Sequence, residues 1–148
     1  DVDPDSWRSM LSWVPQSPTL VPGSILDNMG GLPLADLEQA AQATGFDAVL
    51  DTTPDGWNSV IGVGGVGLSV GQRQRLALTR ALAAHSQIVI LDEPTAHLDA
   101  VSEKTVVRAI TTMRDEGRTV IVIAHRNAII EVADAIIDVV SADEEALA

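Results

Sequence analysis

Short apolar runs alternate with longer amphipathic stretches along the second half of the chain. The runs at 88–91 and 119–124 are unbroken, which is typical of strands buried in a parallel sheet. Asp99 can cap a helix that begins at Ala100, and Gly117 can end it. In order, this half predicts a helix at 70–84, a strand at 88–91, a helix at 100–116, a strand at 119–124, a helix at 127–133 and a strand at 136–140.

The first half has a mainly helical pattern that glycine and proline interrupt more often. Gly45 ends the longest helical stretch of this half, and proline and glycine mark the turns. In order, this half predicts the end of a strand at 12–14, helices at 34–44 and 47–51, a break at 54–56 and an irregular segment at 62–67. The two halves together indicate a mixed α/β fold.

Composition limits the classes of protein without naming one. With 148 residues, 46% of them hydrophobic, the chain can bury one core, and a single domain is expected. It has no cysteine, so disulfides and thiolate metal sites are excluded. The net charge of −12 disfavours a nucleic-acid-binding surface but is compatible with a specific nucleotide pocket. No apolar run approaches the ~20 residues that span a bilayer.

The most informative stretch is 68–99, LSVGQRQRLALTRALAAHSQIVILDEPTAHLD. Its first residues open a helix, so Ser69 and the following backbone N–H groups lie where a helix attracts phosphate. The apolar run at 88–91 ends in Asp92 and Glu93, at the carboxyl end of a strand, where open α/β sheets bind ligands. A metal-bound phosphate fits both features.

This stretch resembles the ATPase domains of ABC transporters, in which an LSGGQ-type signature precedes a Walker B strand ending in Asp-Glu and a short D-loop. The resemblance extends from about Trp7 to Val140. It implies a P-loop NTPase-like α/β fold in which a helical subdomain with the signature, at about 17–84, adjoins part of a parallel-sheet core at about 85–140. It also implies ATP and Mg²⁺ as ligands.

The resemblance assigns the chemistry of hydrolysis to four residues. Asp92 would hold Mg²⁺ and Glu93 would polarise the attacking water. His125 resembles the switch histidine, which contacts the γ-phosphate. Gln16 resembles the Q-loop glutamine, whose amide oxygen touches Mg²⁺ or the water. Taken alone, an acidic turn, a histidine at a strand end and a glutamine in a turn more often have structural roles.

The signature is implied to contact ATP held by a second nucleotide-binding domain. Ser69, Val70, Gly71, Gln72 and Asp99 are the positions that match nucleotide-binding residues of the signature and D-loop. Val70 replaces the usual first glycine of the signature, which narrows the allowed dihedral angles there. Related variants occur in exporters linked to cytochrome bd assembly, which move cysteine or glutathione, and the chain resembles that subgroup.

The glycines of 62–67 formally fit the dinucleotide fingerprint GxGxxG. No convincing strand precedes them and no acidic residue follows at the required distance, so we reject this interpretation. The segment is similar to the exporter contact loop, where Val63 stands in place of the usual glutamate. This departure puts the polar contact with a transmembrane coupling segment in doubt. His85 and His97 receive no catalytic role.

The chain contains no phosphate-binding loop ending in Gly-Lys-Ser/Thr. We therefore expect the C-terminal part of an exporter nucleotide-binding domain, which alone binds ATP weakly and hydrolyses it negligibly. The resemblance implies an exporter transmembrane domain and a second nucleotide-binding domain as partners, no nucleic acid, and a location at the cytoplasmic face of the cell membrane. The alternatives are a soluble ABC-type ATPase of repair or translation and a non-catalytic module with the same fold.

Overall fold

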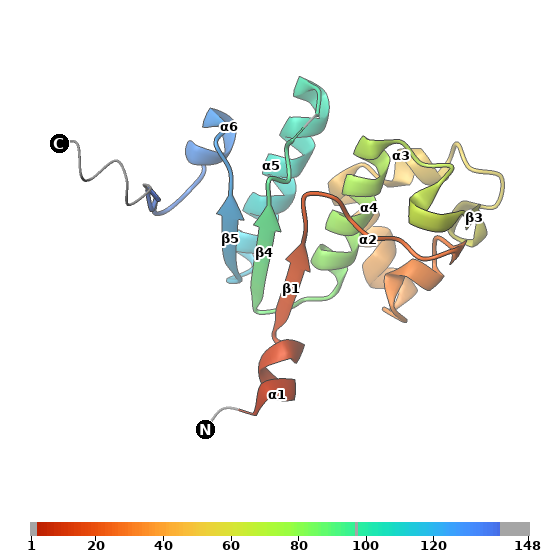
Figure 1. The fold of residues 1–148 in the computed structure, drawn as a ribbon, viewed down its shortest axis with the longest axis horizontal. Coiled ribbons are helices and arrows are strands. Elements are labelled where there is room, and N and C mark those ends of the chain that lie inside the picture. The colour runs from red at the N-terminus through yellow and green to blue at the C-terminus, as the bar shows by residue number, and fades with distance from the viewer. Residues whose placement is uncertain (1–2, 97, 140–148) are drawn as a thin grey trace.

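A parallel three-stranded sheet forms the centre of the computed structural model, which describes residues 3–96 and 98–139. The strands are β1 (Leu11–Val14), β4 (Ile88–Asp92) and β5 (Thr119–Ile123), and β4 lies between the other two. All three run in the same direction, so their carboxyl ends meet at one edge of the sheet (Figure 1). The strands expected at 88–91 and 119–124 are confirmed to within one residue.

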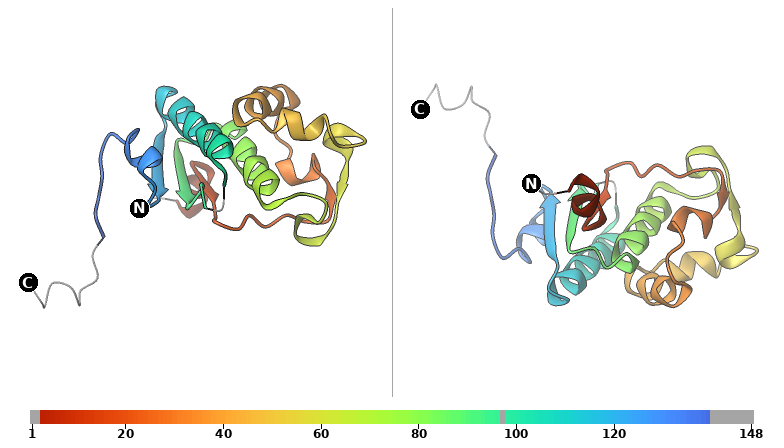
Figure 2. Two further views of the ribbon diagram at one scale, coloured as in Figure 1. Left: turned by 90° about the horizontal axis from the view of Figure 1, so that it is seen from above. Right: turned by 90° about the horizontal axis from the view of Figure 1, so that it is seen from below.

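The longest helices pack on one face of this sheet and extend away from it. The two that cover the sheet are α4 (Val70–Ala83) and α5 (Ala100–Asp115), and α2 (Leu34–Thr44) packs against both (Figure 2). The helices expected at 34–44, 70–84 and 100–116 are therefore confirmed within a residue at each end. The remaining elements are α1 (Pro4–Ser9), β2 (Gly23–Ser24), η1 (Asp27–Met29), α3 (Asp47–Leu50), η2 (Gly56–Asn58), β3 (Val60–Ile61), η3 (Val63–Gly65) and α6 (Asn127–Ile130).

A single hydrophobic core joins the helical part to the sheet. Leu76 and Leu78 of α4 are fully buried, as are Leu91 of β4 and Met113 of α5. Phe46, at the start of α3, is the largest fully buried side chain. Burial of a Leu or Phe side chain contributes roughly 1.5–3 kcal/mol, so these residues hold the helical part against the sheet.

Burial of β5 differs from the expectation for a strand inside a parallel sheet. Its residues alternate between exposed and half-buried, and Ile121 and Ile123 are about half exposed. Trp13 of β1 is exposed to a similar extent. The reason is that α4 and α5 cover only one face of the sheet within the described residues, so every second apolar side chain faces outward.

The C-terminal elements are the main error of the sequence-based prediction. The strand expected at 136–140 is absent from 136–139, and Val140 lies outside the described residues. In the described part of the chain, no strand pairs with the outer edge of β5. An extended segment that pairs with no strand lacks the hydrogen bonds of a β-ladder for its backbone groups. Ile137 is 87% exposed. The helix expected at 127–133 ends earlier, since α6 stops at Ile130.

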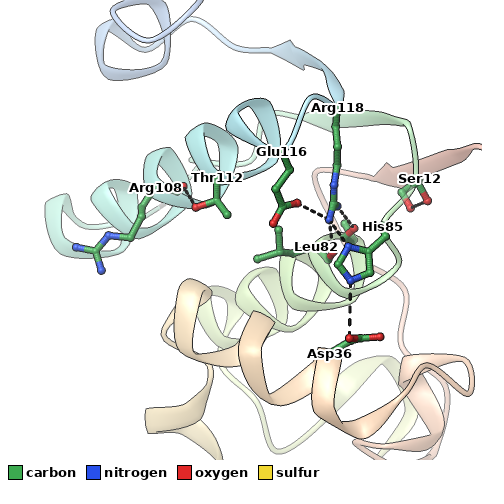
Figure 3. A network of polar contacts seen from close by, with 10 residues as sticks. Ser12, Asp36, Leu82, His85, Arg108, Thr112, Glu116 and Arg118 are labelled. Atoms are coloured by element: carbon green, nitrogen blue, oxygen red, sulfur yellow. Dashed lines mark hydrogen bonds and ion pairs between the residues drawn. The ribbon is translucent and has the colours of Figure 1, made fainter.

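A polar network around Arg118 connects the sheet to the helical part (Figure 3). The buried Arg118 guanidinium donates to the carbonyls of Ala81 and Leu82 at the end of α4 and pairs with Glu116 at 2.6 Å. It also donates to Nδ1 of His85 at 2.8 Å, and the other ring nitrogen lies 3.9 Å from Asp36 of α2. His85 thus has a structural environment, away from the residues expected to be catalytic.

None of the helices in 3–96 and 98–139 combines the length and the apolar character needed to cross a bilayer.

Candidate functional site

Three of the predicted site residues meet where the parallel strands end. Gln16 follows β1, Glu93 follows β4 and His125 follows β5. The sheet places β4 between the other two strands, which puts Glu93 between Gln16 and His125. These residues, called here the strand-end group, come from segments far apart in the sequence and lie at the edge where α/β sheets bind ligands.

Glu93 is the centre of the strand-end group. Its Oε2 accepts a hydrogen bond of 3.0 Å from Nε2 of Gln16, and its Oε1 lies 3.7 Å from Nδ1 of His125. The Glu93 side chain is about one-third exposed and that of His125 about three-quarters exposed. Water can therefore reach the carboxylate, which Gln16 holds by a hydrogen bond while His125 lies beside its other oxygen.

The backbone of Glu93 has an unusual conformation that directs its side chain. Its φ is +44°, in the left-handed region that non-glycine residues rarely occupy, at a cost of roughly 1–2 kcal/mol. The Glu93 N–H donates to the carbonyl of Ile123 at 2.8 Å, and the Glu93 carbonyl accepts from Ala96 at 3.0 Å. These hydrogen bonds hold the sharp turn directly after the strand, at the position that the sequence assigns to catalysis.

Asp92 is the last residue of β4 and is half-buried beside Glu93. Within the described residues, no three His, Cys, Asp or Glu side chains are grouped to hold a metal ion by themselves. The ligands available at this edge are the carboxylates of Asp92 and Glu93 and the amide oxygen of Gln16. Mg²⁺ prefers such oxygens and commonly takes only one or two protein carboxylates, completing its shell with phosphate and water. The residues present therefore fit a magnesium ion bound together with a phosphate.

The signature residues form a capped helix start. Ser69 is the N-cap of α4, where its Oγ accepts from the Gln72 N–H at 3.2 Å. Gln72 reciprocates, because its Oε1 accepts from the Ser69 N–H at 2.8 Å. The cap uses Ser69 Oγ as an acceptor, so its hydroxyl proton stays available to an anion at the helix start.

Val70 and Gly71 follow without backbone strain. Val70 is the first residue of α4 and 56% exposed, and it has ordinary helical geometry, so valine in place of glycine imposes no unusual dihedral. A Cβ on Gly71 would meet only Leu98 Cδ2, at an ordinary contact distance of 3.5 Å. Nothing within the described fold requires glycine at 71, which is consistent with close approach of another molecule there.

Asp99 lies across a hollow from the signature. It is the N-cap of α5 and accepts from the Ser102 N–H at 2.7 Å. The hydrogen bond from the Ser102 backbone, then that from its hydroxyl, lower the pKa of Asp99, and the charge of Arg75 adds to them. The hollow has a volume of about 420 Å³ and is lined on its polar side by Ser69, Gly71, Gln72, Arg75, Asp99 and Ser102.

The structure therefore separates the predicted residues into two sets. Gln16, Glu93 and His125 form the strand-end group, with Asp92 beside it. The residues around the hollow are called the signature group, and they comprise Ser69, Gly71, Gln72 and Asp99. His97 lies outside the described residues.

Sequence reasoning missed several arginines that support these groups. Arg126, next to His125, donates to Glu103 of α5 at 3.0 Å, which anchors the segment after β5. Arg75 donates to Ser102 at 2.7 Å. Arg75 follows Gly71 by one helical turn, so the spacing along α4 could have placed it on the signature face.

The comparisons with known proteins identify the family of this chain. The sequence model of a family described as ABC transporter matches residues 2–96, which is more than half of the chain. The chain belongs to the ABC transporter family. An ATP-dependent lipid A-core flippase of Pseudomonas aeruginosa is 40% identical over 135 residues, covering 88% of this chain and 22% of that protein. The α-hemolysin translocation ATP-binding protein HlyB of Proteus vulgaris is 39% identical over 139 residues, covering 91% and 20% respectively.

The structural comparison gives the same result for the fold. A bacterial Atm1-family ABC exporter solved with ATP bound matches with a TM-score of 0.76 and 32% identity, over 88% of this chain and 23% of that one. The chain thus spans about a fifth of these exporters. It is part of an exporter-type nucleotide-binding domain of the P-loop NTPase-like α/β class, with a helical subdomain and part of the parallel-sheet core.

Proposed function

We propose that this ABC transporter segment supplies the water-activating residues for one ATP and the signature for another. The observation that carries the proposal is the convergence of Gln16 and His125 on the two oxygens of Glu93. A carboxylate that one hydrogen bond orients, that an imidazole flanks and that is open to water is suited to act as a general base. The surrounding strand ends provide the edge at which a nucleotide phosphate binds.

In this proposal Glu93 accepts a proton from the attacking water as it approaches the γ-phosphate. His125 donates a hydrogen bond to a γ-phosphate oxygen, and its exposed ring is free to turn toward the ligand. Gln16 holds the carboxylate and, after turning its amide, offers its oxygen to the ion or the water. When bound with the nucleotide, Mg²⁺ would neutralise charge on the β- and γ-phosphates, with Asp92 as its protein ligand.

The signature group is proposed to serve ATP held by a second nucleotide-binding domain. Ser69 offers its hydroxyl proton, and the N–H groups at the start of α4 add the positive end of a helix. Asp99 lies across the same hollow and completes the surface that meets the second domain. In this arrangement one ATP is shared by two domains, so its binding favours their association.

ATP-driven export is the proposed role of the full-length protein that contains this chain. The helical region at about 17–84 and the core at about 85–140 are proposed as the two structural units of this chain. A transmembrane domain is proposed as its partner at the cytoplasmic face of the membrane.

Val63 is 76% exposed, with Val60 and Val66 exposed nearby. We therefore propose that an apolar contact replaces the usual polar one to the coupling segment. The transported substrate is not assigned, and the resemblance to cysteine or glutathione exporters stays a prediction based on Val70.

The test is magnesium-dependent ATP hydrolysis by the full-length polypeptide in a membrane or detergent. Replacing Glu93 by Gln keeps the size and hydrogen bonding of the side chain but removes the base, so kcat should fall about a hundredfold or more while ATP binding persists. Glu38→Gln, at an exposed position of α2, is the matched control and should keep the wild-type rate. Wild-type turnover in Glu93→Gln would refute the proposal, and absence of turnover in the unaltered protein would favour a non-catalytic module.

The 148-residue chain alone gives a second test. Because its sequence contains no Gly-Lys-Ser/Thr phosphate loop, we propose that it binds ATP weakly and hydrolyses it negligibly. Robust turnover by the chain alone that Glu93→Gln abolishes would overturn this part of the proposal.

A further inference from the structure

Arg75 is a charged side chain that joins three helices and has no role in the function described so far. It lies on α4, where its Nη2 donates to Ser102 Oγ at 2.7 Å and its Nη1 donates to the Gly45 carbonyl at 3.4 Å. Ser102 belongs to the first turn of α5, and Gly45 ends α2. One guanidinium thus fixes the spacing of all three elements.

The contact to α2 is favourable on electrostatic grounds. Carbonyls at a helix end carry partial negative charge, and the guanidinium lies beside the one that closes α2. Gly45 has a φ of +66°, in the left-handed region, and a Cβ there would lie 3.9 Å from Arg75 Nη1. Glycine at 45 is thus favoured by the left-handed backbone, and the contact from Arg75 does not itself require it.

The contact to α5 continues to Asp99. Guanidinium groups only donate hydrogen bonds, so Ser102 Oγ must accept from Arg75, and its own proton is free for another acceptor. Asp99 Oδ1 accepts from the Ser102 backbone N–H at 2.7 Å, so Ser102 links Arg75 to Asp99 through its hydroxyl on one side and its backbone on the other. From Arg75 through Ser102 to Asp99, each hydrogen bond thus joins a donor to an acceptor. This series of contacts is called here the relay.

The position of this relay ties it to the signature. Arg75, Ser102 and Asp99 line the same hollow of about 420 Å³ as Ser69 and Gly71. Within the described residues, Nε of Arg75 is buried without a hydrogen-bond acceptor. A buried donor without a partner opposes folding, so the two hydrogen bonds from Nη1 and Nη2 are the favourable contacts of this guanidinium.

We infer that Arg75 is a positioning residue that holds Asp99 at a fixed place relative to the signature turn of Ser69 and Gly71, so that both meet the nucleotide of the second domain together. The inference rests on the proposed function, because it assigns Arg75 to the shared ATP site. It places the residue behind the surface that touches the ligand. Its loss should therefore affect the turnover of bound ATP more than the binding of ATP.

The experiment measures ATP hydrolysis, ATP binding and thermal unfolding of the full-length polypeptide and its variants. Arg75→Ala should lower kcat about tenfold and leave the Kd for ATP within about twofold. Arg75→Lys keeps the charge but cannot contact Ser102 and Gly45 at the same time. Its kcat should therefore lie between that of the wild type and that of Arg75→Ala. Arg108→Ala, which removes an exposed arginine from α5, is the control and should keep the wild-type kcat.

A double-mutant cycle with Ser102 tests the relay itself. Ser102→Ala should lower kcat about threefold to fivefold, and the double variant should fall no lower than Arg75→Ala, since both changes break one chain of contacts. Independent, multiplying effects on kcat would overturn the relay. A lower melting temperature of Arg75→Ala with wild-type kcat would reduce Arg75 to a structural residue and overturn the inference.

The controls separate this inference from the proposed function. If Arg75→Ala fails to fold, Ser102→Ala decides, and wild-type kcat in that variant overturns the inference. A wild-type protein without turnover, or with turnover unaffected by Glu93→Gln, overturns the proposed function and the inference with it. Wild-type kcat in Arg75→Ala alongside loss in Glu93→Gln overturns only the inference.

Discussion

The strand-end group and the signature group are built in opposite ways. Glu93 receives its neighbours Gln16 and His125 from other strands, and the contact to Gln16 spans 77 positions of the sequence. Ser69 and Gln72 instead satisfy each other within one helical turn. The first arrangement depends on the register of the sheet, whereas the Ser69–Gln72 cap forms wherever α4 forms, and only Asp99 reaches the signature group from another helix. Substitutions should therefore affect the first group through geometry and the second through helix stability.

The largest effect is expected at His125 of the strand-end group. His125→Ala removes a hydrogen-bond donor from the phosphate site, so kcat of the full-length polypeptide should fall about a hundredfold with little change in melting temperature. His85→Ala is the matched control, because His85 belongs to the Arg118 network. That variant should lower the melting temperature and keep kcat. The opposite pattern in steady-state kinetics and thermal unfolding would mean that the two histidines have been assigned the wrong roles.

A smaller effect is expected from the cap of α4. Ser69→Ala removes the acceptor for the Gln72 N–H and should lower the free energy of unfolding by about 1 kcal/mol. Ser69→Thr keeps the hydroxyl and should lose less. Urea unfolding of the two variants measures the difference. Equal losses would show that the capping hydroxyl does not stabilise the signature group.

Restoring glycine at the signature should cost stability. Val70→Gly replaces an unstrained helical residue by one with more freedom in the unfolded state, so the free energy of unfolding should fall by up to about 1 kcal/mol. Stabilisation in a denaturant titration would reveal strain at Val70 that its helical geometry does not indicate. The ATPase rate of the same variant measures whether valine limits the approach of the second domain.

The smallest effect concerns pH. The pKa of Asp99 is lowered below its usual 3.8, first by the backbone hydrogen bond from Ser102. A lowered folded-state pKa contributes stability that is present above 3.8 and is lost as the pH falls through the folded value. Asp99→Asn should therefore flatten the loss of stability below pH 3.8 in urea titrations at successive pH values. A variant as acid-sensitive as the wild type would exclude this contribution.

Local patterns in the sequence predicted the helices and the helix start at Ser69. The ends of α2, α4 and α5 follow from Gly45, Ser69 and Asp99, because caps depend on a few neighbouring residues. The strand-end residues were named from motif order, which says what they are but not how they touch.

The errors lie where distant segments decide the outcome. The expected strand at 136–140 is absent from 136–139, and in the described part of the chain no strand pairs with the outer edge of β5. The apolar run of β5 suggested a buried strand, yet Ile121 and Ile123 face outward because helices cover only one face. The helical spacing could place Arg75 on the signature face, but no local pattern gives the partners of Arg75 and Arg118, which come from other elements.

The sequence by itself determined the order of the elements, the capped helix starts and the chemical identity of the candidate residues. These depend on backbone propensities and hydrogen bonds within a few residues. Only the tertiary structure decided that Glu93 lies between Gln16 and His125, that Asp99 shares a hollow with Ser69, and that Arg75 joins three helices. Such contacts depend on the register of parallel strands and the packing of helices, which no local pattern encodes.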